Sequence, residues 1–220
     1  MNSKTFFSLI APAKLNLFLH INARRDDGYH ELETLFTFLN FGDELSFELT
    51  DESSILITGD TKDIPLEDNL IYKAALMLQT DAKTKHGVKI NLIKRLPMGG
   101  GVGGGSSDAA TTLLALNKLW NINYDINKLA NLGLQLGADV PVFIRGESAI
   151  AQGIGEKLHR VELAQKWYCV VHPNQHVSTA KIFTHPDLKR DTPKISGDWK
   201  QQTLHNDCEP LVKKLCPEVE

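Results

Sequence analysis

The stretch from Pro97 to Leu116, PMGGGVGGGSSDAATTLLAL, combines residue types that could bind a phosphate group. Six glycines lie within the seven positions 99–105, and Ser106, Ser107 and an apolar helical pattern follow. Each glycine costs roughly 0.5–1 kcal/mol relative to alanine in regular structure, so a cluster this dense needs a functional reason. Glycine lets the backbone approach a ligand closely, and the N–H groups at a helix N-terminus bind anions. The spacing therefore predicts a phosphate site, with the two serine hydroxyls as additional donors.

Two familiar phosphate motifs fit this stretch poorly. A P-loop requires Gly-Lys before a Ser or Thr, and no Gly-Lys occurs here. Gly99, Gly101 and Gly104 formally match the G-x-G-x-x-G of dinucleotide-binding folds. The acidic residue that such folds carry about 20 positions later would fall in WNINYDIN, which is not a strand pattern. The remaining alternative is a flexible surface loop with ordinary Ser/Asp capping, but the strand and helix that flank the glycines favour phosphate binding.

The elements that must hold this stretch can be read from the periodicity of apolar residues. GVKINLI (87–93) alternates apolar and polar residues and predicts a strand, and residues 107–120 predict a helix. DNLIYKAALMLQT predicts an earlier helix with Asp68 as its cap. A further helix is expected over residues 125–136, because Asp125 can cap its start and Gly137 can end it.

Strict alternation over residues 13–22 predicts a strand. Its core face is expected to be Ala13, Leu15, Leu17, Leu19 and Ile21, and its polar face Lys14, Asn16, Phe18, His20 and Asn22. After an Asp27-Gly28 turn, ELETLFTFL, DELSFEL and SILIT predict further strands of an antiparallel sheet. Downstream, GADVPVFIRG and KWYCVVHP predict strands, the second with Cys169 packed inside, and AIAQGIGEKLHRV predicts a hairpin. STAKIF predicts a helix start and HPDLKRDTPKISGD a loop, so the fold class is expected to be α+β.

Composition limits the function classes. The 220 residues are 42% hydrophobic and 23% charged, as in a folded protein, and the net charge of −3 argues against broad nucleic-acid binding. No apolar run reaches the ~18–20 residues of a membrane span. The three cysteines form no close metal-binding pair and suit a reducing compartment. We expect a cytoplasmic protein without a nucleic-acid, membrane or obligate protein partner.

Five stretches in a fixed order resemble the GHMP kinases, a superfamily of small-molecule kinases. They are APAKLNLFLHI, RRDDGYHELETLF, EDNLIYKAA, PMGGGVGGGSSDAA and LGADVPVFIRG, and KWYCVVHP and STAKIF extend the likeness to about residue 183. Within the superfamily, the set is most similar to the kinases whose acceptor is a cytidyl-erythritol compound of the non-mevalonate isoprenoid pathway. The resemblance implies a two-domain GHMP kinase fold, with an N-terminal ATP-binding domain of mixed sheet and helices at 1–152 and an incomplete C-terminal α/β domain at 153–220.

The resemblance implies transfer of the γ-phosphoryl group of ATP, with Mg²⁺, to the 2-hydroxyl of the cytidyl-erythritol substrate; it does not identify the metal ligands. Asp139 matches the catalytic base and Lys14 the catalytic lysine, which would keep the carboxylate ionised and orient the acceptor oxygen. Asn16 matches a substrate-binding residue beside them. Taken from the residues alone, Asp139 is instead a turn former and Lys14 a solvated lysine on a polar strand face.

The same resemblance assigns residues to the two parts of the site that would bind the cytosine ring of the substrate and the adenine ring and phosphates of ATP. Tyr29 would stack on the cytosine ring, His30 would hydrogen-bond the base, and Phe183 would form the opposing stack; the residues alone predict an exposed hairpin tip at DGYH. Asn69 would read the adenine edge beside Leu70, although helix capping is its alternative role. The remaining ATP-binding positions are Pro97, Met98, Gly99, Gly100, Gly101, Val102, Gly103, Gly104, Gly105, Ser106 and Ser107.

Two departures from the family pattern matter for function. Family members carry a third glycine-rich motif late in the chain, which this sequence lacks, and this predicts a C-terminally truncated chain. Asp108 stands where some members have Asn. Two alternative functions therefore stay open: a nucleotide-binding module without turnover, and a kinase of the superfamily that acts on another small alcohol.

Overall fold

The computed structural model describes residues 6–61, 64–175 and 177–220, and these divide into two compact units. Unit 1 holds the described residues of Met1–Ala13 together with Leu39–Leu96 and Gly103–Gly146. Unit 2 holds Lys14–Phe38, Pro97–Val102 and Glu147–Glu220. The division at residue 152 that the family resemblance implies remains a prediction.

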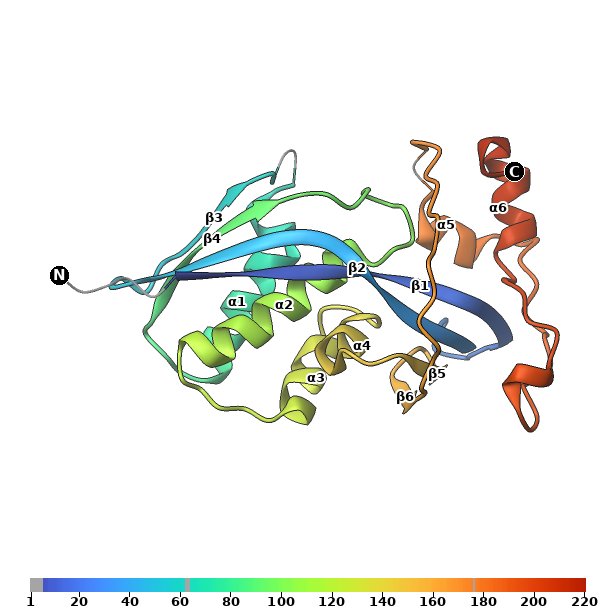
Figure 1. Cartoon of the computed structure of the whole chain (residues 1–220), viewed down its shortest axis with the longest axis horizontal. Helices are drawn as coiled ribbons and strands as arrows, with labels where there is room; N and C mark the ends of the chain where they lie inside the picture. Colours follow the sequence, from blue (N-terminus) through green and yellow to red (C-terminus); the bar gives the residue numbers. More distant parts are fainter. Residues whose placement is uncertain (1–5, 62–63, 176) are drawn as a thin grey trace. The chain divides into compact units, whose positions relative to one another are not determined.

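Strands and helices come in runs along the chain and the sheet pairings are largely antiparallel, which confirms the α+β expectation. The strands labelled in Figure 1 are β1 (Phe6–Arg24), β2 (His30–Thr50), β3 (Ile55–Gly59), β4 (Gly87–Ile93), β5 (Ala149–Gly153) and β6 (Lys157–Arg160). The helices are α1 (Leu70–Asp81), α2 (Gly104–Leu119), α3 (Ile126–Leu134), α4 (Val140–Arg145), α5 (Thr179–Thr184) and α6 (Glu209–Leu215), with short 3-10 turns η1 (Leu66–Asp68), η2 (Trp199–Gln201) and η3 (Pro217–Val219). The strand order is β3-β4-β2-β5-β6, and β1 pairs with β2.

The sheet is mixed, whereas the sequence predicted that its first strands would all be antiparallel. β2 pairs antiparallel with β4 in unit 1, from Glu44 opposite Ile93 to Thr50 opposite Gly87, but β3 pairs parallel with β4. The two predicted strands ELETLFTFL and DELSFEL are one continuous strand, β2. Gly42 makes this continuity possible, because a Cβ atom there would lie 2.0 Å from the carbonyl oxygen of Ala11 in β1.

The polar face predicted for β1 is the buried one. Lys14, Phe18 and His20 are buried, whereas Leu17 is exposed, so the predicted core face is wrong over this part of the strand. The period of two was read correctly, but the packing of β2 decides which face is covered: Lys14 lies over the ring of Phe36, 5.3 Å from its centroid. The core-face prediction holds for Ala13 and Ile21, which are fully or almost fully buried.

Unit 1 packs its helices around α2. Figure 1 shows α1 and α2 side by side, and α2 also contacts α4. α1 is capped by Asn69 rather than by the predicted Asp68, and the Asn69 side chain accepts a hydrogen bond from the backbone of Ile71. Asp125 caps α3 as predicted, by accepting from the backbone of Lys128. Among the described residues, no helix is long and apolar enough to cross a bilayer.

The segment predicted as a strand in GADVPVFIRG is the helix α4. Its residues Val140–Ile144 are buried, so the segment has no polar face from which a period could be read. Pro141 in the first turn and Gly146, which is left-handed at φ 65°, are the usual start and stop of a short helix. This helix places Asp139 at its N-cap position.

In unit 2, β5 and β6 form the predicted hairpin, and β5 pairs antiparallel with the first part of β2. α5 confirms the predicted helix start at STAKIF. KWYCVVHP is not a strand: Trp167 is fully exposed and the thiol of Cys169 is exposed rather than packed inside. The unit's described core gathers around Ile21, Ile182, Leu188 and Leu211.

Candidate active site

The glycine stretch forms the turn that leads into α2. Gly99, Gly101 and Gly103 all have left-handed backbone conformations, with φ between 70° and 75°. No side chain caps α2 at Gly103, so the N-terminal N–H groups are not covered by a capping oxygen. A turn of this kind suits the binding of an anion, because backbone donors and the positive end of the helix dipole act together.

Gly101 tests this backbone requirement separately from packing. A Cβ atom on Gly101 would meet nothing within 4 Å, so Gly101→Ala strains the backbone without a steric clash. We expect this variant to raise the KM for ATP about 5–30-fold, as for a cost of roughly 1–2 kcal/mol in the bound conformation. Gly197→Ala is the matched control, because Gly197 is exposed, has φ 78° and is equally open. An equal KM for ATP in both variants would contradict a phosphate-binding role.

The first turn of α2 carries a buried hydroxyl that has no hydrogen-bond partner among the described residues. It is the Oγ atom of Ser107, a residue that is fully buried. An unsatisfied hydroxyl in a protein interior costs about 1–3 kcal/mol, which a bound phosphate oxygen would recover. Ser106 precedes it, and its Oγ lies 3.7 Å from the Cβ position of Gly137, two residues before Asp139. The start of α2 and the α3–α4 connection are therefore neighbours.

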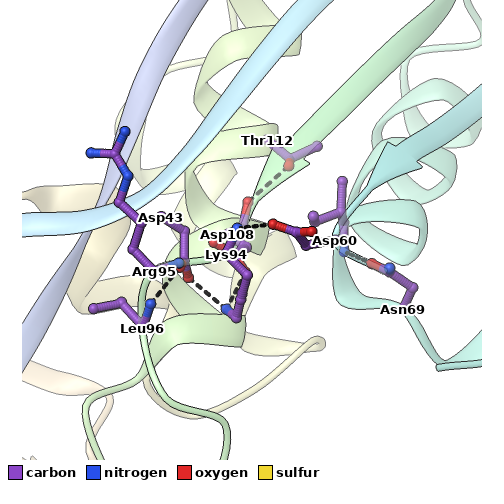
Figure 2. A network of polar contacts seen from close by, with 9 residues as sticks. Asp43, Asp60, Asn69, Lys94, Arg95, Leu96, Asp108 and Thr112 are labelled. Carbon is purple, nitrogen blue, oxygen red and sulfur yellow. Dashed lines mark hydrogen bonds and ion pairs between the residues drawn. The ribbon is translucent and has the colours of Figure 1, made fainter. Parts of the chain in front are cut away.

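A buried ionic network supports the start of α2 (Figure 2). The Nζ atom of Lys94 lies 2.5 Å from Oδ2 of Asp43 and 3.0 Å from Oδ2 of Asp108. Asp43 also accepts hydrogen bonds from the backbone N–H groups of Arg95 and Leu96, at 2.6 and 2.8 Å. The network thus ties β2 and the end of β4 to α2, and it fixes the residues on both sides of the glycine turn.

Two carboxylates share one ammonium in this network, and this affects their titration. Burial, opposed by the charge of Lys94 and assisted by the nearby Asp43, raises the pKa of Asp108 to about 7. Burial acts to lower the pKa of Lys94, but the two carboxylates outweigh it and the pKa is raised. Oδ1 of Asp108 is buried without a hydrogen-bond partner among the described residues, as expected for a carboxyl group that costs free energy to ionise.

The variant Asp108→Asn should remove this titration. The wild-type carboxyl keeps its proton in the native state up to about pH 7, whereas the unfolded chain releases it near the ordinary Asp value. The contribution of Asp108 to stability therefore falls as the pH rises from about 4 to 7. We expect the free energy of unfolding of the variant, relative to wild type, to rise by about 1–3 kcal/mol between pH 5 and pH 8 in urea titrations. The exposed control Asp68→Asn should show no such trend.

Asn69 and Leu70 lie beside the same helix start. Asn69 is buried and uses its side-chain oxygen to cap α1, so the capping role is real. Leu70 reaches α2, because its Cδ1 atom is 3.3 Å from the Cβ position of Gly105. Within unit 1, the structure therefore groups Asn69, Leu70 and the α2 start, and it places Asp139 at the N-cap of α4, where its carboxylate makes no capping bond.

Lys14 and Asn16 form a second group, in unit 2. The ammonium of Lys14 donates to Oδ1 of Asn16 at 2.5 Å, and the Asn16 amide donates to Oγ1 of Thr34 at 2.7 Å. Thr34 in turn donates to the carbonyl oxygen of Phe18. Lys14 is only 6% exposed, so the solvated lysine that residue type alone predicts is wrong. This chain of hydrogen bonds fixes both side chains on the buried face of β1.

The first half of the glycine stretch belongs to unit 2 and is joined to β1. The backbone N–H of Lys14 donates to the carbonyl oxygen of Val102 at 3.0 Å. Gly100 is a tight position, where a Cβ atom would lie 2.9 Å from Cγ of Pro97 and 3.2 Å from the ring of His172. Met98 is 62% exposed. The lysine assigned as catalytic by resemblance is thus bonded through its backbone to the glycine turn.

Unit 2 also brings together two of the three residues assigned to the cytosine ring. The rings of His30 and Phe183 lie 5.3 Å apart and are tilted by 55°. His30 is buried, and burial followed by the charges of Arg190 and Arg24 lowers its pKa. Tyr29 is 59% exposed on the turn between β1 and β2, as its alternative reading predicted, and an exposed ring can stack on a ligand from the solvent side.

Several residues of these groups were not predicted as site residues. Asp43, Lys94 and Thr34 support the glycine turn and the Lys14–Asn16 pair, and Arg190 donates to His30. The signal for Asp43 and Lys94 was present, because both are charged residues at the ends of apolar strand patterns. No sequence signal pointed to Arg190, which lies in a polar, Pro-broken loop.

Comparison with known proteins agrees with the predicted superfamily. Residues 69–147 match the family described as GHMP kinases N terminal domain. The chain is 79% identical, over its full length and 78% of the relative, to 4-diphosphocytidyl-2-C-methyl-D-erythritol kinase of Pseudoalteromonas translucida. It is 61% identical, over 96% of its length and 74% of the relative, to the protein of the same name from Tolumonas auensis. A solved 4-(cytidine 5'-diphospho)-2C-methyl-D-erythritol kinase superposes with a TM-score of 0.79 at 34% identity, covering 96% of this chain and 79% of that one.

Proposed function

The chain belongs to the family of 4-diphosphocytidyl-2-C-methyl-D-erythritol kinases within the GHMP kinases, and from this premise we propose its acceptor and its catalytic residues. It is a small-molecule kinase. In our proposal it transfers the γ-phosphoryl group of ATP to the 2-hydroxyl of 4-diphosphocytidyl-2-C-methyl-D-erythritol. A cytoplasmic location is part of the proposal, supported by three cysteines that are all free thiols.

ATP is held at the start of α2 in this proposal. The left-handed glycines, the uncapped helix N-terminus and the unpartnered Ser107 hydroxyl support phosphate binding there. Asn69 and Leu70, beside Gly105, are assigned to the adenine ring. Since positioning and charge stabilisation provide most of the rate in phosphoryl transfer, a rigid turn of backbone donors suits this chemistry.

Asp139 and Lys14 carry the chemical step. Asp139 accepts the proton of the 2-hydroxyl as the acceptor oxygen forms its bond to the γ-phosphorus and the bond to the ADP oxygen breaks. The proton moves onto the Asp139 carboxylate and is then released to water. The products are the phosphorylated acceptor, ADP and a proton. The ammonium of Lys14 stabilises the negative charge that develops, and Asn16 orients the acceptor.

The observation that carries this proposal is the burial of Lys14. A buried ammonium is costly unless it has anionic or polar partners, and a solvated lysine would serve a strand face equally well. Lys14 is 6% exposed and bonded to Asn16, on a strand face whose other members Phe18 and His20 are also buried. A buried ammonium with polar partners is typical of a site that handles phosphate.

Mg²⁺ is the finer part of the proposal. No three His, Cys, Asp or Glu side chains gather into a metal site within the part of the chain that the structure describes. Mg²⁺ does not require such a cage, since it keeps several waters and binds through substrate phosphates and one or two protein oxygens. The buried hydroxyl of Ser107 is a fitting protein oxygen, and the metal would neutralise charge on the transferring phosphate.

The proposed reaction can be tested directly with the chain as it stands. ADP release is measured with ATP, Mg²⁺ and 4-diphosphocytidyl-2-C-methyl-D-erythritol, and product formation is followed by phosphorus NMR. Homoserine and galactose serve as matched acceptor controls, because kinases of the same fold are named for them. We expect ADP release that depends on the cytidyl acceptor. ATP binding without turnover, or faster turnover with a control alcohol, would refute the assignment in favour of one of the two alternatives.

A further inference from the structure

Arg190 makes four hydrogen bonds that converge on one part of unit 2. Its Nε atom donates to Nε2 of His30 at 2.9 Å, and its Nη1 atom donates to the carbonyl oxygen of Leu188 at 2.9 Å. Its Nη2 atom donates to the carbonyl oxygens of Phe183 and His185, at 2.9 and 2.7 Å. Arg190 is half-buried, and the planar guanidinium holds these four acceptors in a fixed geometry.

The bond to His30 determines the state of that ring. Nε2 accepts a hydrogen bond from a group that is always charged, so Nε2 carries no proton. In a neutral imidazole, the proton must then lie on Nδ1. His30 is therefore held as a ring with one defined donor, and the backbone of Phe183, whose ring packs 5.3 Å away, is held by the same guanidinium.

We propose that Arg190 is a positioning residue for recognition of the substrate's base, acting through the tautomer of His30 and the placement of Phe183. The inference rests on the proposed function, in which His30 and Phe183 contact the cytosine. A fixed Nδ1–H donor suits the acceptor atoms on the edge of cytosine, O2 and N3, and an unfixed ring would present the donor only part of the time.

The charge of Arg190 also disfavours protonation of His30. Burial lowers the pKa of His30 most, and the positive charges of Arg190 and then Arg24 lower it further. Among the residues that the structure describes, Arg190 and Arg24 are the charged groups that shift the pKa of His30. Loss of the charge at 190 therefore raises the pKa of His30, and the ring protonates at a higher pH than in wild type.

A purely structural role is the alternative, because three of the four bonds close the end of α5 onto the loop after it. Such a role would lower the melting temperature without a preference between substrates. The variant Arg190→Gln removes the charge and the planar guanidinium, and Arg190→Lys keeps the charge but replaces the planar guanidinium with a single ammonium group. Arg160→Gln is the matched control, since Arg160 is an exposed arginine of unit 2 paired with Glu147 on the surface.

Steady-state kinetics and imidazole nitrogen NMR of the full chain form the test. For Arg190→Gln we expect the KM for the cytidyl substrate to rise about 10–100-fold, as for loss of a charged hydrogen bond, with the KM for ATP unchanged. The acid limb of its kcat/KM profile should move to higher pH, and Arg190→Lys should recover part of both effects. Arg160→Gln should match wild type.

The NMR measurement needs no substrate and separates this inference from the proposed function. The wild-type His30 ring should show the Nδ1–H tautomer, and Arg190→Gln should shift it toward Nε2–H. If wild type fails to use the cytidyl substrate, the proposed function fails, while the tautomer result still decides the positioning effect on His30. An unchanged tautomer in Arg190→Gln, or an unchanged KM for the cytidyl substrate beside a lower melting temperature, would overturn the inference.

Discussion

Replacement of Asp139 by Asn is expected to lower kcat by a factor of about 10²–10⁴, which is the range for loss of a general base. The KM for ATP should change by less than about threefold, because the glycine turn and α1 are untouched. Asn has nearly the same shape as Asp and serves equally well at a helix N-cap, where Asp139 lies. The loss should therefore reflect the proton-accepting carboxylate and not the fold, as measured by steady-state kinetics together with the melting temperature.

Asp125→Asn provides the matched control for that variant. Asp125 occupies the N-cap of α3 in the same unit, and its side chain caps the helix at Lys128. Both substitutions are Asp to Asn at a helix start, and only the one at 139 falls in the proposed site. A kcat for Asp139→Asn within tenfold of the Asp125→Asn value would show that Asp139 is not the base.

The second large effect is expected for Lys14→Met, which should lower kcat about 10²–10³-fold, as for removal of one group that stabilises transition-state charge. Met keeps the length and apolar body of the side chain, so its packing over the Phe36 ring is largely preserved. The amide of Asn16 loses its ammonium donor but keeps its own bond to Thr34. Kinetics and thermal unfolding of the same preparation measure the two consequences separately.

Lys89→Met is the control for the lysine. Lys89 lies on β4, points to solvent and is an ordinary strand lysine of the kind that residue type alone predicted for position 14. Its replacement should leave kcat unchanged. Equal kcat values for the two variants would mean that Lys14 is buried for structural reasons, and the proposed chemical step would then lose its cation.

The elements flanking the glycine turn could be predicted because their periods are local. Residues 87–93 are β4, and the predicted helix from 107 begins only three residues earlier, at Gly104, because glycines of the turn enter its first turn. The helix α4 was missed because its first five residues, Val140–Ile144, are all buried and show no period. The apolar residues around Trp167 predicted a strand. A strand also needs a neighbouring strand with which to hydrogen-bond, and apolar composition does not show whether one is present.

The site was predictable where a motif fixes it and not where distant contacts do. The glycine turn follows from local chemistry, since its left-handed glycines involve neighbouring residues, and the predicted cap of α1 at Asp68 is wrong by one residue, at Asn69. The buried face of β1 depends on Thr34 and Phe36 of the adjoining strand, so alternation alone selected the wrong face. Arg190 contacts a histidine 160 positions earlier in the chain, and no single-sequence pattern encodes such a pair.

The close approach of Gly42 to the backbone of β1 has a consequence for large-scale mutagenesis. Since the carbonyl oxygen of Ala11 occupies the volume of any side chain at 42, even alanine would force apart two adjoining backbones. A growth-based scan of all substitutions would therefore score position 42 as intolerant as Asp139, although no reactant approaches it in our proposal. Only assays on purified variants would tell the two apart, because a variant at 42 should lose folded protein and one at 139 should lose turnover per folded molecule.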